Sequence, residues 1–259
     1  MQQTRWSDTV PIFILGLGIL LVFLFLPLAG FDNALSIVSL ILTPLIAFML
    51  GIFGLRIFGR GSEEREDQIQ TLYLWLSIGL LMLSLSELAT SIVKTIQSPL
   101  PIEVTVGLVQ MPGLLLWGFG ILQYLRSVNS ALELLNSDRL WSVLLIGTTL
   151  ATLFLVVINA VYNPLIGSIE SIVMSPLVIG LVLFTSVTLG LVWIFRQGEF
   201  AKSLVLIFIG FFIYLIRTAQ WALATSILGN PSNSLFALEA FMFFGAAFIL
   251  ARNLGNPSQ

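Results

Sequence analysis

The chain has no cysteine and no histidine among its 259 residues. Thiol nucleophiles, disulfide bonds, haem held by Cys or His, His-bound zinc and Ser-His-Asp triads are excluded, because each requires one of these side chains. Only catalysis by carboxylate, hydroxyl or lysine groups remains. We therefore expect no cofactor and no metal, and a membrane-embedded enzyme acting on lipid ranks last among the function classes.

Charged residues are also scarce. They make up 9% of the chain, whereas about a quarter of the residues in soluble proteins are charged. The net charge is −2, and no block of like charge is long enough to attract nucleic acid, so no nucleic-acid partner is expected. Hydrophobic residues reach 58%, which indicates that the surroundings of the chain are a lipid bilayer.

The apolar residues form long runs without the alternation of outer-membrane strands, which predicts an all-α polytopic membrane protein. Each run approaches the roughly 20 residues that a helix needs to cross the hydrocarbon core. The first run is long for a signal peptide and Asp8 weakens its positive flank, so we expect a retained span. We predict a single transmembrane domain over 1–259, without a soluble domain, as a bundle of eight transmembrane helices. The spans are 9–28, 34–58, 71–96, 104–125, 140–162, 171–195, 203–228 and 235–251.

Basic residues predict the orientation of these spans. Nine of the eleven Lys and Arg residues lie at the N-terminus, in the even-numbered connections or at the C-terminus. The positive-inside rule then places both termini in the cytoplasm. We expect a multi-pass protein of the cell membrane.

Short sequence matches suggest an internal duplication. The second span contains LTPLIA (42–47) and the sixth MSPLVI (174–179), while the third contains SIGLLM and the seventh FIGFFI, each followed by ATSI. Four spans per half would give a 4+4 parallel repeat, as in some transporters. Chance similarity between apolar helices is the alternative, because a small residue alphabet makes coincidences frequent.

Three charged residues lie inside predicted spans, where a charge is costly and normally has a partner. They are Glu87, Arg217 and Glu239. Spans three and seven run in the same direction, and the helical rise places Glu87 and Arg217 at similar depths, roughly 13 to 17 Å from the outer face. Glu239, roughly 8 Å deep by the same rise, is the second choice of partner for Arg217.

Polar residues follow one face of each of these two spans, since 100° per residue brings them within a narrow stripe. The stripe on span three contains Ser77, Ser84, Glu87, Ser91 and Lys94. The stripe on span seven contains Tyr214, Arg217, Gln220, Trp221 and Ala224. One interpretation is a structural pair with Ser, Tyr and Gln hydrogen bonds that fixes helix packing. The other is a pocket that holds an anionic or carbonyl group at Arg217, with Glu87 as counter-ion.

Two functions follow from these observations. The first is a receptor-like or accessory module that holds a small amphipathic molecule or a partner subunit within the helix bundle. The second is a small secondary transporter that uses the intramembrane Glu/Arg pair. The expected partners are the lipid bilayer and either of these ligands.

Overall fold

Six long helices make up the described part of the chain. A computed structural model describes residues 32–59, 68–96, 102–131, 168–195, 198, 200–222 and 230–255, and the isolated positions 14, 18, 142, 146, 147, 149 and 153. The helices are α2 (Asp32–Phe58), α3 (Gln68–Ile96), α4 (Ile102–Ala131), α6 (Ser168–Ile194), α7 (Ala201–Ala222) and α8 (Asn230–Gly255). All six are long and apolar enough to cross a membrane, so the chain is a multi-pass membrane protein.

Six of the eight predicted spans correspond to these helices, with ends that differ by a few residues. Spans 9–28 and 140–162 lie almost wholly outside the described residues, as does the end of the seventh span at 223–228. The count of eight therefore stays a prediction.

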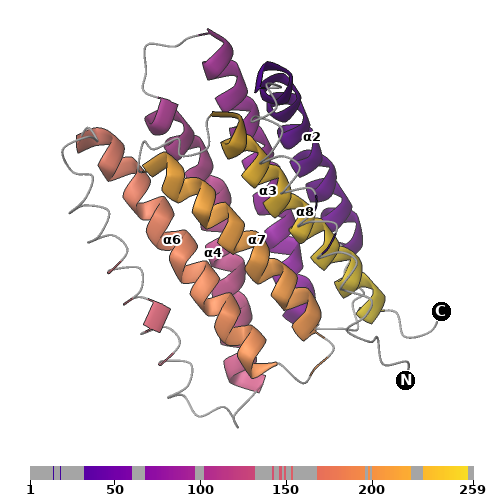
Figure 1. Cartoon of the computed structure of the whole chain (residues 1–259). Helices are drawn as coiled ribbons and strands as arrows, with labels where there is room; N and C mark the ends of the chain where they lie inside the picture. Colours follow the sequence, from indigo (N-terminus) through magenta and orange to yellow (C-terminus); the bar gives the residue numbers. More distant parts are fainter. Residues whose placement is uncertain are drawn as a thin grey trace.

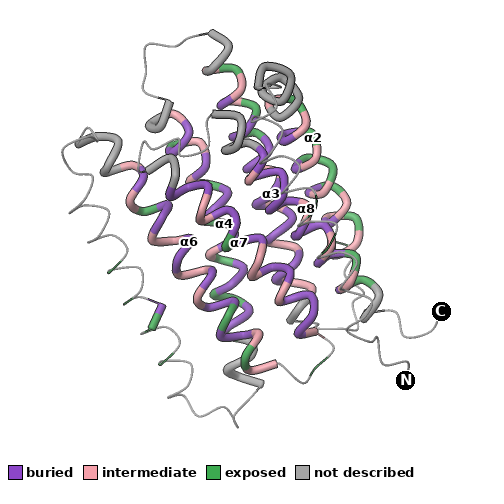
Figure 2. The backbone as a smooth tube through the Cα atoms, in the orientation of Figure 1, coloured by how far each residue is buried: buried purple, intermediate pink, exposed green. Residues whose placement is uncertain are grey.

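The six helices form two facing layers (Figure 1). Helices α2, α3 and α4 pack in sequence order in one layer, and α6, α7 and α8 in the other. At the two edges α2 packs against α8 and α4 packs against α6. This arrangement makes α3 and α7 the central helices of their layers, and many of their residues are buried (Figure 2).

Glycines allow the close packing within and between the layers. An added Cβ at Gly79 of α3 would overlap the indole of Trp117 on α4, and one at Gly113 would lie 2.8 Å from Leu83 Cγ. Across the edge between α2 and α8, a Cβ at Gly245 would lie 2.6 Å from Leu50 Cδ2. Small residues let transmembrane backbones approach each other where lipid provides no hydrophobic drive for association.

Helices α3 and α7 are parallel and keep one register over four turns. Tyr73 Oη donates to Ser203 Oγ at 2.5 Å near the first residues of both helices. Fourteen residues further along both helices, Arg217 contacts Glu87. The separation in sequence is 130 residues at both contacts, so the depth match expected for Glu87 and Arg217 follows from a constant register.

Candidate functional site

Glu87 and Arg217 form a buried ion pair at the centre of the two layers. Arg217 Nη2 lies 2.5 Å from Glu87 Oε1, and the two side chains are only 2% and 3% exposed. Arg217 Nη1 also donates to Tyr214 Oη at 2.8 Å, one turn earlier on α7. Charge-assisted contacts of this kind are shorter and stronger than neutral ones. The structure thus brings together three of the site residues that the sequence indicates.

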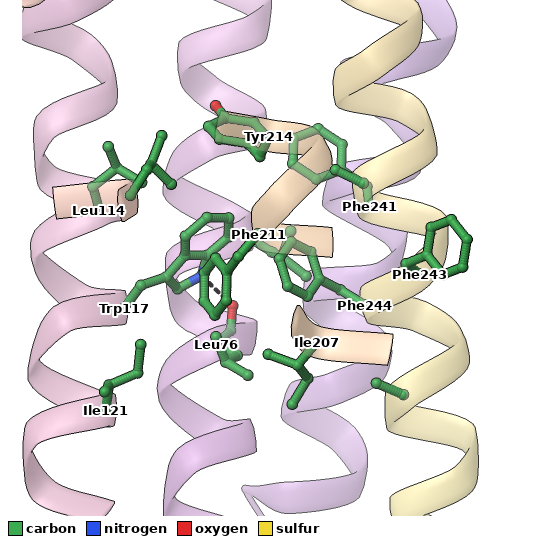
Figure 3. Packing of buried hydrophobic residues seen from close by; sticks show 14 of the residues in the cluster. Leu76, Leu114, Trp117, Ile121, Ile207, Phe211, Tyr214, Phe241, Phe243 and Phe244 are labelled. Atoms are coloured by element: carbon green, nitrogen blue, oxygen red, sulfur yellow. Dashed lines mark hydrogen bonds between the residues drawn. The ribbon is translucent and has the colours of Figure 1, made fainter. Parts of the chain in front are cut away.

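Tyr214, which bonds to Arg217, is part of a cluster of aromatic rings inside the bundle (Figure 3). The Tyr214 ring lies 5.7 Å from Trp117 of α4 and 5.8 Å from Phe241 of α8, measured between centroids. Trp117 also contacts Phe211 and Phe244, and its Nε1 donates to the Leu76 carbonyl of α3 at 3.0 Å. The rings exclude water from one side of Arg217, which strengthens its attraction to Glu87 because the local dielectric is low.

Ser84 and Ser91 lie on a neighbouring face of α3, against α2. They line an apolar, partly open groove of about 570 Å³ between α2 and α3. The other lining residues are Leu40, Ile41, Pro44, Leu45, Phe48, Leu85 and Leu88. Ser84 Oγ donates to the Leu81 carbonyl, and the single hydroxyl hydrogen of Ser91 is within reach of two carbonyls, those of Leu40 and Glu87, each 2.9 Å from Oγ. The groove wall therefore presents hydrocarbon.

Pro44 explains the bond that joins Ser91 to α2. A proline has no N–H, so the carbonyl four residues earlier, that of Leu40, loses its helical donor. Ser91 Oγ donates to this carbonyl at 2.9 Å from the adjacent helix. The pair Ser91 and Leu40 is thus a polar link between α2 and α3 at one end of the groove, in keeping with how neighbouring helices satisfy backbone groups freed by proline.

Glu239 lies apart from the ion pair, although its side chain is 2% exposed. It precedes Phe241 on α8 by two residues, so the two side chains are separated by roughly 200° around the helix at 100° per residue. Because Phe241 contacts Tyr214, Glu239 points away from Arg217. Its Oε2 has no hydrogen-bond partner among the described residues. The ion pair of Arg217 is with Glu87, the first choice of partner from the sequence, and a place for Glu239 in the same site stays a prediction.

The remaining residues of the two stripes are placed only in part. Gln220 and Trp221 belong to the last turn of α7, but their side chains lie outside the described residues, as does that of Lys94 on α3. Ala224 lies beyond the described end of α7. Ser77 is buried, and its Oγ donates to the Tyr73 carbonyl within α3. The prediction that all of them share one pocket stays untested.

Several residues at the site carry no signal that the sequence analysis used. Among the residues that the structure describes, Trp117 is the largest fully buried side chain, yet in the sequence it is one more apolar residue of its span. Gln110 and Ser86 are buried polar residues on the facing sides of α4 and α3. Ser86 lies outside the polar stripe described on its span and Gln110 belongs to a span without such a stripe, so a count of every polar residue inside the spans would have found both.

The chemistry available at the described site is limited to a carboxylate, a guanidinium, a phenol, hydroxyls and an amide. Within the described residues, no three Asp, Glu, His or Cys side chains gather as metal ligands. The charges of Glu87 and Arg217 cancel, so the pair as a whole attracts neither anions nor cations strongly. No protein-family model, curated protein sequence or solved structure matches the chain.

Proposed function

We propose that the chain is a receptor-like or accessory membrane module that holds the hydrocarbon chain of an amphipathic molecule in the groove between α2 and α3. The groove is the observation that carries this proposal. Its volume of about 570 Å³ falls within the range of about 300 to 1,000 Å³ typical of small-molecule sites.

The surroundings of the groove support a hydrocarbon occupant that enters from the bilayer. Ile41, Leu45 and Phe48 on α2 and Leu85 and Leu88 on α3 are all among the exposed large hydrophobic residues. Since lipid tails contact such a face, a tail reaches the groove without crossing water. Specificity for the polar headgroup would come from residues outside the groove lining.

A photoreactive fatty acid that carries a diazirine on its alkyl chain tests this proposal. Leu88→Trp fills the groove, whereas Leu115→Trp adds the same ring to the face of α4 where Leu115 is 72% exposed. We expect crosslinks concentrated on α2 and α3, lost in Leu88→Trp and kept in Leu115→Trp. Crosslinks spread evenly over all exposed helices in the unmodified protein, or kept in Leu88→Trp, would refute it.

The symmetry of the helix contacts supports a second candidate, the secondary transporter. The contacts α2 with α3, α3 with α4 and α4 with α6 recur in order as α6 with α7, α7 with α8 and α8 with α2. A two-fold rotation about the bundle axis that exchanges the two layers produces this pattern. It agrees with the proposed 4+4 parallel repeat.

Two equivalent contacts between a glycine and an aromatic ring favour the same rotation. Gly79 admits Trp117 at the contact of α3 with α4, and Gly210 admits Phe244 at the contact of α7 with α8. Gly79 and Gly210 occupy the same place in SIGLLM and FIGFFI. Trp117 and Phe244 then meet each other near the axis, with ring centroids 5.1 Å apart.

Flux measurements separate the two candidates. A transporter that couples to the ion pair loses pH-dependent uptake into proteoliposomes when Glu87→Gln is folded and inserted normally. If no compound in a broad substrate panel is taken up by the proteoliposomes, the transporter is rejected and the accessory module is the remaining candidate. Co-purification of a stoichiometric subunit in mild detergent would indicate that the partner of this module is a protein and not a hydrocarbon chain.

A further inference from the structure

Two buried polar atoms next to the ion pair lack a protein partner. Ser86 Oγ on α3 and Gln110 Nε2 on α4 have no hydrogen-bond partner among the described residues. The two side chains are 0% and 2% exposed. Such atoms are rare, because about nine in ten or more buried polar groups bond to protein or to ordered water.

The register of α3 and α4 places the two residues at opposing positions of the two helices. Gly79 of α3 faces Trp117 of α4. One turn further along the contact, Leu83 of α3 faces Gly113 of α4, which is four residues later on α3 and four residues earlier on α4. The next inward step on antiparallel helices is three residues on each. It brings Ser86 opposite Gln110.

Both residues lie at the level of the ion pair. Ser86 directly precedes Glu87 on α3, and Gln110 lies two helical turns from Trp117, on the α4 face that points to the bundle centre. The hydroxyl of the nearby Thr90 is engaged, since its Oγ1 donates to the Ser86 carbonyl at 2.8 Å. A donor and a hydroxyl thus face each other across a contact that is otherwise apolar.

We propose that Ser86 and Gln110 hold bound water beside the Glu87–Arg217 pair, as a polar site inside the bundle. A Gln110 N–H donates to the water oxygen, and the water donates to Ser86 Oγ. The amide nitrogen only donates, so it does not ligate a cation, and the neighbouring charges cancel, so no net charge recruits an anion. Water fits because it needs two to four polar partners and little space. The site does not depend on the groove between α2 and α3.

The absence of cysteine makes a direct test practical. Ser86→Cys introduces the only thiol, whose S–H stretching band is read by infrared spectroscopy of the protein in detergent or lipid. Leu80→Cys, at a fully buried apolar position of the same helix, is the matched control. We expect a hydrogen-bonded thiol at residue 86, which exchanges its proton for deuterium about tenfold or more faster than the thiol at residue 80. Equal band positions and equal exchange rates would overturn the proposal.

Removing the amide donor checks the assignment. In the Ser86→Cys protein, Gln110→Leu takes away one of the two side chains that hold the water, and the thiol band is expected to move to the position found at residue 80. A band that stays unchanged would show that Gln110 does not hold the water. This outcome would also reject the site as described.

Thermal unfolding of variants without cysteine gives an independent test that does not rely on the introduced thiol. If water bridges the pair, Ser86→Ala and Gln110→Leu each lower the Tm, and the double variant loses less than both losses combined, because the second change removes an already orphaned group. If the atoms are dry and unbonded, each single change raises the Tm and the increases add. That second result would overturn the proposal.

Discussion

Glu87 and Arg217 neutralise each other in the interior of the bundle, so either side chain alone would be a buried charge. Glu87→Gln keeps the shape of the side chain and removes its charge. We expect a loss of stability of about 3 kcal/mol, since breaking a buried pair leaves its partner uncompensated. Thermal unfolding in detergent measures it.

The double variant Glu87→Leu with Arg217→Met controls this prediction. Replacing both partners of a buried ion pair by apolar residues is often neutral or stabilising, so the double variant should unfold near the temperature of the unmodified protein. A double variant that is less stable than Glu87→Gln would show that the pair supports structure beyond mutual neutralisation.

Gly79 is a second residue whose identity is dictated by its neighbours. Gly79→Ala places a methyl group against the Trp117 indole, and overpacking of this kind costs about 1 to 3 kcal/mol. Gly180→Ala on α6 is the control, because the nearest atom to its added Cβ is 3.9 Å away. We expect a lower Tm for the first variant only; equal shifts would contradict the packing argument.

Among the elements, the link between α2 and α3 depends on the proline of one helix and the serine of the other. Ser91→Ala leaves the Leu40 carbonyl without its donor from α3, and we expect a loss of about 1 kcal/mol. In a Pro44→Ala background the restored N–H of residue 44 bonds to the same carbonyl, so Ser91→Ala should cost less. A double-mutant cycle of unfolding free energies measures the difference. Equal costs in both backgrounds would mean that the serine does not compensate for the proline.

For the helices, the sequence predicted their positions along the chain well, but not which face of each helix contacts lipid and which contacts the core. Long apolar runs are sufficient to locate spans such as α3 and α7, and the cost of a charge in lipid is sufficient to single out Glu87 and Arg217. The groove and the role of Trp117 were not predicted. In a bilayer the outward and inward faces are both apolar, so periodicity does not tell a lipid-facing Leu88 from a core Leu83.

For polar residues, the sequence predicted which way they face but not their hydrogen-bond partners. Their types predicted that Ser84 and Ser91 avoid lipid, but not what they bond to. Both satisfy backbone carbonyls, and such bonds depend on helix register, which a single sequence does not supply. Glu239 was predicted at a plausible depth, yet depth alone does not fix the direction of a side chain around its helix.

For the molecule as a whole, the described basic residues support the orientation that we infer. Arg56, Arg126 and Arg252 lie at the ends of α2, α4 and α8, and Lys202 lies at the start of α7. Since α3 is antiparallel to α2 and α4, and α7 to α8, these four residues are at one end of the bundle. The positive-inside rule predicts that this end faces the cytoplasm.

Labelling with a membrane-impermeant maleimide checks the orientation in the cysteine-free chain. We expect Ser98→Cys, in the predicted outer connection after α3, to react in intact cells. Arg252→Cys should react only after the membrane is permeabilised. The reverse pattern would invert the topology and place both termini outside.

The two contacts that join α3 to α7, fourteen residues apart, restrict how the layers can move. A piston-like slide of one layer past the other by a single turn would separate Tyr73 from Ser203 and Glu87 from Arg217 at the same time. Sideways tilting of α2, which is bonded to α3 through Ser91 and the Leu40 carbonyl at one end of the groove, leaves both contacts intact. If a bound molecule changes the conformation of this protein, we expect α2 to tilt away from α3. We do not expect one layer to slide past the other along the membrane normal.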